Sequence, residues 1–240
     1  MCTVTIIPKG ENDFVLTSNR DEAPDRLPLV PDFYTIDNVK LLFPKDEKGG
    51  TWIGVSENKR VVCVLNGAFV KHKRQSNYRK SRGVIANDFM IALDIVKAVE
   101  AYNLIDIEPF TIVIADWNLG LRFYELIWDG ECKHFTQLPL ESKIWSSSTL
   151  YNANMRDERQ KWFEDFEAVN KLNANTLLDF HKNKDVGNMD YGVIMDRGFV
   201  KTTSVTQIEK VEENLTMKYE NIENNTITSK IFNLQEIVNG

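Results

Sequence analysis

The sequence predicts a layered α+β fold, in which helices pack outside antiparallel sheets. Runs rich in β-branched and aromatic residues dominate the first and last parts of the chain, and helical periodicity is confined to separate blocks. The turns between the strand-like runs are short, which favours antiparallel pairing over the long crossovers of a parallel sheet. The chain has 240 residues, 42% of them apolar, which is enough for one core. We therefore expect one domain over residues 1–240.

The first third of the chain is expected to form two hairpins. Their strands are predicted at residues 3–7, 14–17, 51–56 and 60–65. Gly10 lies in the turn of the first hairpin and Asn58 in the turn of the second, where both residue types are common. The stretch between the hairpins is predicted to be a loop, because it contains three prolines: Pro24, Pro28 and Pro31.

The first helix is expected after a basic loop at residues 71–82. Ser81 is suited to cap it, because a serine hydroxyl accepts a hydrogen bond from a first-turn N–H. Apolar residues recur at helical spacing from Val84 to Val99, so a helix is predicted over this segment. Two further helices are expected, at residues 157–170 and 175–182.

The remaining strands are expected in pairs around short turns. They are predicted at residues 110–115, 121–128, 135–138, 143–147, 191–195, 199–205, 215–221 and 226–232. Turns containing Gly, Asn or Asp, such as 118–120 and 196–198, separate them. This order of elements favours an α+β architecture over a doubly wound one.

Composition and charge exclude several classes of protein. A net charge of −6 argues against nucleic-acid binding, which needs a basic surface. No run of about 18 apolar residues occurs, so no membrane span is expected. The first residues do not resemble a secretory signal, and three cysteines in no known framework favour a reducing compartment. We therefore expect a cytoplasmic protein. Its three histidines are far apart in sequence, so neither a metal site nor a cofactor is implied.

Cys2 is the first residue that suggests chemistry. Its small side chain permits removal of Met1, which exposes an α-amine with a reference pKa of about 7.7–8.0. That amine can act as the base for the cysteine's own thiol, whose reference pKa is about 8.5. No histidine is then needed for catalysis. The alternative interpretation is a small buried cysteine in an edge strand.

The second arm of the first hairpin places polar residues near Cys2. A turn centred between Gly10 and Glu11 would pair Ile7 with Phe14 and Cys2 with Asn19. The segment 18–22 would then lie beside the cysteine.

Two side chains of that segment suit such a site. Asp21 could hold the α-amine through a charge-assisted hydrogen bond, and Arg20 could lower the thiol pKa. The alternative is a solvated turn formed by Arg20, Asp21 and Glu22, since many surface charges contribute little.

The motifs Met-Cys-Thr at the start and Ser-Asn-Arg-Asp-Glu at 18–22 resemble the NRDE family. That family includes the transport-and-Golgi-organisation protein two group, and it belongs to the N-terminal-nucleophile hydrolases, near the choloylglycine and penicillin V acylases. Further segments that match are residues 49–54, 65–69, 78–83, 146–151, 159–163 and 202–206.

This resemblance implies a four-layer αββα sandwich and hydrolysis of carbon–nitrogen bonds other than peptide bonds. Cys2 would form an acyl-enzyme, with Asp21 as its partner. Asn66 matches an asparagine that the acylases use for the oxyanion, through a backbone N–H or its side-chain amide. Its alternative role is a strand-end turn residue. We expect the Cys2 strand and the strand that ends at Asn66 to share one sheet.

The chain departs from the acylases at two places. Ser18 stands where those enzymes carry an arginine, a role that Arg20 could take over. Their second oxyanion asparagine corresponds to Ser146 or Ser147, whose hydroxyl can also donate a hydrogen bond. Arg159 is the candidate for a later arginine that helps the thiol, or else a surface helix residue.

The basic segment 71–82 suggests how a substrate binds. Arginine pairs with carboxylates and phosphates, so an anionic small-molecule amide would fit here. The candidate binding residues are His72, Arg74, Arg79 and Arg82. A solvated loop is the alternative. The competing function is non-enzymatic handling of haem or lipid, as the eukaryotic branch of the resemblance suggests, and His72 is the one histidine near the expected cleft. The substrate and the oligomeric state are not specified by the sequence.

Overall fold

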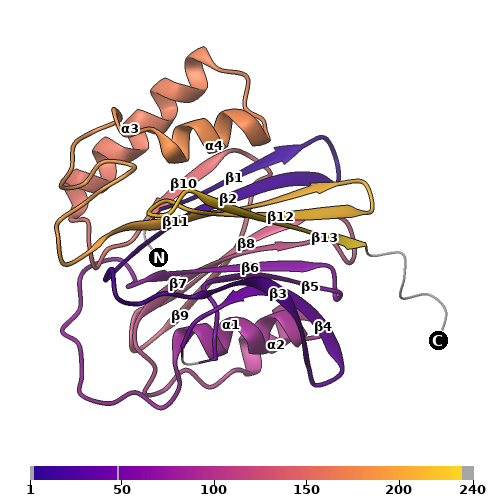
Figure 1. Cartoon of the computed structure of the whole chain (residues 1–240). Coiled ribbons are helices and arrows are strands. Elements are labelled where there is room, and N and C mark those ends of the chain that lie inside the picture. The colour runs from indigo at the N-terminus through magenta and orange to yellow at the C-terminus, as the bar shows by residue number, and fades with distance from the viewer. Residues whose placement is uncertain (1–2, 48, 234–240) are drawn as a thin grey trace.

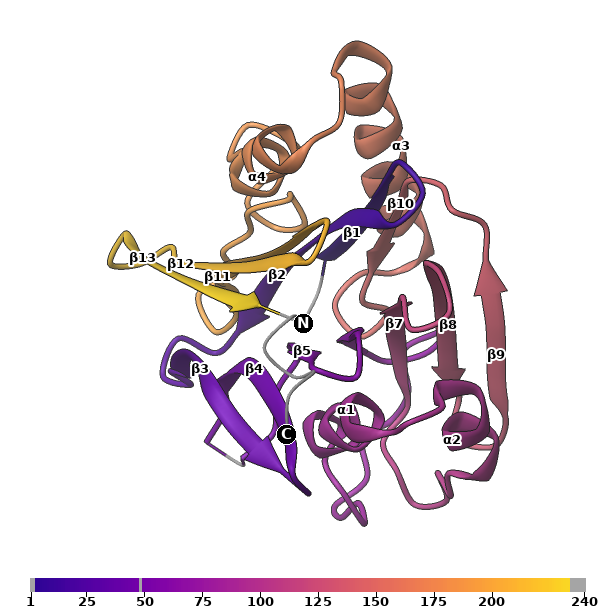
Figure 2. The same cartoon turned by 90° about the vertical axis from the view of Figure 1, so that its right-hand side faces the viewer.

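The protein is a sandwich of four layers, two antiparallel sheets between two helical layers (Figure 1). The structure, a computed structural model, describes residues 3–47 and 49–233. Neighbouring strands in both described sheets pair antiparallel. The helices lie on the outer faces, as the second view also shows (Figure 2). The predicted αββα fold is therefore confirmed.

The first sheet carries the N-terminal part of the chain. Its strands, in spatial order, are β10 (Lys143–Ser146), β1 (Thr3–Lys9), β2 (Asp13–Glu22), β11 (Lys201–Val211), β12 (Asn214–Asn221) and β13 (Thr226–Asn233). Two helices cover its outer face: α3 (Ala153–Val169) and α4 (Ala174–Lys182).

In the second sheet the strands lie side by side in the same order as in the sequence, and two helices are inserted between its fourth and fifth strands. Its strands are β3 (Leu29–Ile36), β4 (Val39–Lys45), β5 (Ile53–Ser56), β6 (Arg60–Asn66), β7 (Phe110–Asp116), β8 (Arg122–Trp128) and β9 (Lys133–Leu138). Its outer face packs against α1 (Arg82–Ile91) and α2 (Ile95–Ala101). Ser81 caps α1 as predicted, since its hydroxyl accepts from the Val84 N–H at 3.3 Å.

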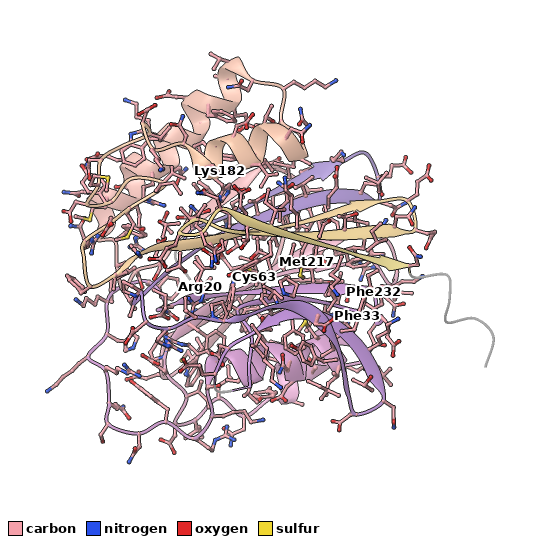
Figure 3. The ribbon with its side chains drawn as sticks, viewed as in Figure 1. Arg20, Phe33, Cys63, Lys182, Met217 and Phe232 are labelled. Atoms are coloured by element: carbon pink, nitrogen blue, oxygen red, sulfur yellow. The ribbon has the colours of Figure 1, made fainter. Side chains whose placement is uncertain are left out.

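The main core fills the space between the sheets, and strand alternation decides which residues enter it. On β2, Phe14 and Leu16 join the inter-sheet core, whereas Val15 packs beneath α4. Figure 3 shows Arg20, Cys63 and Met217 between the two sheets. Arg20 is on the same side of β2 as Leu16, so the strand delivers a buried cation to the inter-sheet space.

The register of the first hairpin differs from the predicted one by one residue. Ile7 pairs with Val15 and Thr3 pairs with Asn19, so the predicted pairs of Ile7 with Phe14 and of Cys2 with Asn19 are wrong. The reason is the loop: β1 ends at Lys9 opposite Asp13, which leaves three residues in the turn. A three-residue turn is centred on residue 11, whereas the predicted turn was centred between residues 10 and 11. The pairing partner of every β1 residue therefore shifts by one residue along β2.

The strand that ends at Asn66 does not share a sheet with the N-terminal strand. β6 lies between β5 and β7 in the second sheet, whereas β1 lies between β10 and β2 in the first. The expectation of one common sheet was wrong, because the chain changes sheets after β2.

The prolines after β2 do not prevent strand formation. Leu29–Ile36 forms an edge strand, with an irregular register between Leu29 and Asp32. Pro31 lies at that irregularity, which is where a residue without an N–H is tolerated.

The structure corrects two further expected elements. The helix expected from Val84 to Val99 is interrupted, because Asp94 caps a separate second helix and leaves Leu93 exposed. The strand predicted at 191–195 is absent from the described structure, in which only an isolated bridge joins Asp196 to Lys201. Within residues 3–47 and 49–233, no helix has the length and apolar character to cross a membrane.

Candidate active site

Asp21, near the end of β2, is held by two hydroxyl groups. Tyr151 donates to its Oδ2 at 2.7 Å, and Thr202 donates to its Oδ1 at 2.7 Å. Thr202 Oγ1 itself accepts from the Met195 N–H at 3.0 Å, so its own proton is directed to the carboxylate. Asp21 is only 3% exposed. The site therefore fixes both carboxylate oxygens before any ligand binds.

A register shift in β11 aims these side chains. Thr202 pairs with Asp21 and Ser204 pairs with Arg20, which leaves Thr203 as the extra residue of a bulge. Thr203 then donates its hydroxyl to the Arg20 carbonyl at 3.0 Å. Bulges of this kind redirect side chains beside functional sites.

Arg159 reaches the start of β1 from helix α3. Its guanidinium donates to Ser146 Oγ at 2.9 Å, to Thr3 Oγ1, and to the carbonyls of Tyr191 and Gly192 at 2.5 and 2.6 Å. The group is 1% exposed, and no carboxylate of the described residues lies within ion-pair distance. A buried positive charge therefore lies against the first described residue of the chain.

The same guanidinium stacks on the aromatic ring that holds Asp21. Its Cζ lies 4.1 Å from the ring centroid of Tyr151. Arg197 approaches this ring at 5.8 Å and donates to the Leu150 carbonyl. The position of the Asp21 carboxylate is thus coupled to that of Arg159 through one tyrosine.

Asn66 and Ser147 bring the two sheets together beside this cluster. Ser147 Oγ donates to the Asn66 carbonyl at 2.6 Å, and it contacts Thr149 Oγ1 at 2.9 Å. The following Gly67 has φ +84°, and a Cβ there would collide with Ser148 and Thr149. Only glycine allows this close approach of the β6 end to the segment after β10.

The hydrogen bonds distinguish the two candidate serines. The Ser147 proton is committed to the Asn66 carbonyl. Ser146 Oγ instead accepts from Arg159 Nε, a bond that does not use its own proton. Ser146 therefore has the freer donor of the two.

Asn19 holds the helical layer to the sheet. Its Nδ2 donates to the carbonyls of His181 and Val193 at 3.0 and 2.8 Å, and its Oδ1 accepts from His181 Nδ1 at 2.5 Å. Burial lowers the pKa of His181 to about 3, so its ring is neutral and its Nε2 accepts a hydrogen bond from the Thr5 hydroxyl at 2.7 Å. The whole Asn19 amide is occupied within the fold, as a support for β1 and β2.

A cleft of about 450 Å³ opens on the other side of β2, and Arg20 and Asn66 both line it. Burial lowers the pKa of Arg20, and its guanidinium lies 4.8 Å from the ring centroid of Trp52. Glu22 is the nearest carboxylate, at 3.9 Å. Arg20 therefore carries a positive charge from the first sheet toward the second.

The basic segment forms a wall of this cleft. Arg74, Arg79 and Arg82 line it, whereas His72 is not among the lining residues. Glu108 lies in the midst of them, 3.1 Å from Arg82, 3.4 Å from His72 and 3.9 Å from Arg74.

These arginines differ in how many of their donors are used by hydrogen bonds within the protein and in how deeply they are buried. Arg79 donates to the carbonyls of Asn103 and Ile105. Arg82 is largely buried, which lowers its pKa, while the side chain of Arg74 is 75% exposed. Arg74 is thus the member with most freedom to follow a ligand.

Sequence reasoning missed the roles of Tyr151, Thr202 and Trp52. All three lie in segments that match the family motifs, but their partners are distant in sequence. Cys2 itself lies outside the described residues, so its assignment as the nucleophile stays a prediction. Among the described residues, no cluster of His, Cys, Asp or Glu side chains suits a metal ion.

The four αββα layers thus carry a polar cluster around the start of the first strand. The chain belongs to the Transport and Golgi organisation 2 family, whose model matches residues 1–232. The resemblance that the sequence motifs indicated is therefore confirmed. A comparison with curated proteins finds no match.

Solved structures of a penicillin V acylase and of a conjugated bile acid hydrolase share the fold at low sequence identity. A penicillin V acylase from Agrobacterium tumefaciens has a TM-score of 0.57 at 10% identity, covering 98% of this chain and 87% of its own. Two variants of the conjugated bile acid hydrolase from Clostridium perfringens have TM-scores of 0.55 and 0.54 at 11% and 10% identity, covering 98% of this chain and 93% of theirs. At these identities the likeness concerns the fold alone.

Proposed function

We propose that the protein hydrolyses a non-peptide amide bond, with Cys2 as the N-terminal nucleophile. The observation that carries the proposal is the pair of buried groups at the start of β1. Asp21 is fixed by two hydroxyls, and Arg159 donates to Thr3, the residue bonded to Cys2. Cys2 directly precedes Thr3 in the sequence, so the proposed nucleophile is the neighbour in the chain of a residue that this cluster holds.

Each group has the chemistry that its role requires. The Cys2 α-amine takes the thiol proton, and Asp21 orients that amine through a charge-assisted hydrogen bond. The thiolate attacks the amide carbonyl, and the protonated amine then gives its proton to the departing nitrogen. Water releases the acyl group from the sulfur by the same proton route in reverse. Arg159 and Arg20 supply positive charge that favours the thiolate.

The oxyanion of the tetrahedral intermediate would be held by Asn66 and Ser146. The Asn66 backbone is fixed by the bond from Ser147 to its carbonyl, which is the preorganisation such a donor needs. Ser146 has a proton free to donate while Arg159 holds its oxygen. Loss of one oxyanion donor typically costs about 10²–10³ in rate.

The charges that line the cleft support the proposal of an anionic substrate. Six cationic side chains and three carboxylates of the described residues line it, although the whole chain has a net charge of −6. Arg74, Arg79 and Arg82 are the proposed contacts. His72 does not line the cleft, and its Nε2 lies 3.4 Å from Glu108 Oε1.

The test is a screen of the purified protein against N-acyl amino acids, N-acyl amines and β-lactams. Intact mass spectrometry should first show a chain that begins at Cys2. With a substrate in hand, an acyl adduct should form on Cys2, and Cys2→Ala should abolish turnover. Hydrolysis at the original rate by Cys2→Ala would show that the nucleophile is another group.

A further inference from the structure

A buried indole that lines the cleft has no hydrogen-bond partner among the described residues. Trp52 lines the cleft, is 7% exposed, and its Nε1 has no acceptor among the described residues. A buried indole N–H normally finds a partner, because leaving a donor unpaired costs free energy. Within residues 3–47 and 49–233, no group supplies the acceptor that this N–H needs.

Arg20 lies over this indole with donors to spare. Its Nη1 donates to the Arg26 carbonyl at 3.0 Å and to Thr203 Oγ1 at 3.3 Å. Among the described residues, Nε and Nη2 make no hydrogen bond, and Glu22 is 3.9 Å from Nη2. Glu22 is itself held by Arg26 at 2.7 Å. A guanidinium edge is therefore left for an outside acceptor.

Trp117 provides an internal comparison. Its Nε1 is also buried and unpartnered, and it lines a separate cavity near the Lys9–Asp13 turn. That cavity carries three lysines and four carboxylates, whereas the Trp52 cleft has an excess of three positive charges. The described structure thus contains two buried indoles without an acceptor. Of these two, Trp52 alone lies beside a guanidinium with unused donors, in a cleft whose lining is net positive.

We propose that Arg20 and Trp52 form a subsite for an oxyanion of the substrate, a carboxylate or a phosphate. The guanidinium edge receives two oxygens side by side, and the indole N–H donates to one of them. Asn66 and the arginines of the basic segment line the same cleft as Arg20 and Trp52, so the ligand's anionic group would be held within that cleft. The inference rests on the proposed function for its meaning, but the binding itself does not need turnover.

The experiment is a titration of full-length Cys2→Ala protein with inorganic phosphate and, separately, with acetate, at constant ionic strength. The indole N–H signals of the five tryptophans are followed by ¹H–¹⁵N NMR and assigned sequentially. The Trp52 signal should shift saturably with at least one anion, while the Trp117 signal stays in place. The arm that saturates at lower concentration identifies the class of oxyanion.

Arg20→Lys keeps the charge but removes the planar fork, and it should weaken this binding about tenfold or more. Trp52→Phe should weaken it similarly, whereas the matched change Trp117→Phe should not. If Trp52→Phe fails to fold, the wild-type titration and Arg20→Lys still decide. An unmoved Trp52 signal, or equal shifts at Trp52 and Trp117, overturns the subsite. If the subsite is overturned but hydrolysis depends on Cys2, the proposed function still holds. If the anion binds saturably but no amide is hydrolysed, the subsite holds and the proposed function fails.

Discussion

The change Tyr151→Phe tests the fixation of Asp21, because it removes one hydroxyl and keeps the ring. The ring stacks on Arg159 at 4.1 Å and is fully buried, so its packing is retained. The lost bond is a 2.7 Å donor to a carboxylate that is 3% exposed. A hydrogen bond to a charged group contributes about 1.5–3 kcal/mol, and Thr202 still donates to the other oxygen.

We therefore expect the free energy of unfolding to fall by about 2 kcal/mol, which for a chain of this size lowers Tm by roughly 4–8 °C. Urea denaturation should show a lower midpoint with an unchanged slope, since the surface exposed on unfolding is the same. In the proposed enzyme, kcat should fall as well, because Asp21 would orient the amine less firmly.

The chain offers a matched control in Tyr191→Phe. Its hydroxyl also donates to a carboxylate, Glu158 at 3.0 Å, and its ring also stacks, on Trp162. That pair is exposed, so the same deletion should cost less than about 0.5 kcal/mol. Equal losses in the two variants would refute the reasoning that burial makes the Asp21 bond valuable.

Three further predictions concern the supports of the site. Gly67→Ala should destabilise the protein by about 2 kcal/mol or more, because the backbone φ is positive and the added Cβ would collide with Ser148. Gly120→Ala should cost about 1 kcal/mol, because φ there is +88° but the Cβ would meet open space. Thermal denaturation of the two variants measures the difference. Burial, with Arg159 nearby, lowers the pKa of His181 from 6.5 to about 3, so the unfolded chain binds more protons in that window and stability is lost as pH falls from about 6.5 toward 3. Urea midpoints against pH should show this fall flattened in His181→Gln and kept in His134→Gln. Burial raises the pKa of the Cys63 thiol to about 12, so iodoacetamide at pH 7.5 should label the exposed Cys132 and leave Cys63 unlabelled. Peptide mass spectrometry measures the labelling of each cysteine. Labelling of Cys63 at a rate similar to that of Cys132 would contradict its burial.

Local pattern was enough to predict most strands and the Ser81 cap of the first helix, but not the Asp94 cap that starts the second helix. Ser81 and its helix, and the hairpin around Asn58, needed only adjacent residues. The register of the first hairpin needed the number of loop residues between Lys9 and Asp13, which sequence patterns fix poorly.

The partners of the site could not be predicted locally, because they come from distant segments. Tyr151 is 130 residues from Asp21, and Thr202 is 181 residues from it. A tyrosine in a motif segment is more often a packing residue than a hydrogen-bond donor to a functional carboxylate. Only the pairing of β2 with β11 and the position of α3 bring these groups together.

The side chains of β2 alternate between its two faces, so two adjacent residues contribute to the candidate site from opposite faces of the strand. Asp21 contacts Tyr151 and Thr202 within the first sheet and its helical side. Arg20, one residue earlier, lies with its Cζ 4.8 Å from the ring centroid of Trp52, which directly precedes β5 of the second sheet. Because successive strand residues face opposite ways, a single strand can hold the group that would orient the amine and the group that would bind the substrate.

Asn66 joins the candidate site from the opposite sheet, through its carbonyl bond to Ser147. The relative position of β1 and of Asn66, the proposed oxyanion donor, therefore depends on the packing between sheets, because β1 and β6 belong to different sheets. A substitution that loosens the contact of Gly67 with Ser148 should thus separate the two halves of the site before it disturbs either sheet. In the proposed enzyme, Gly67→Ala should for this reason lower kcat at temperatures where the protein is still folded, and unchanged kcat with a lowered Tm would show that the junction supports stability alone.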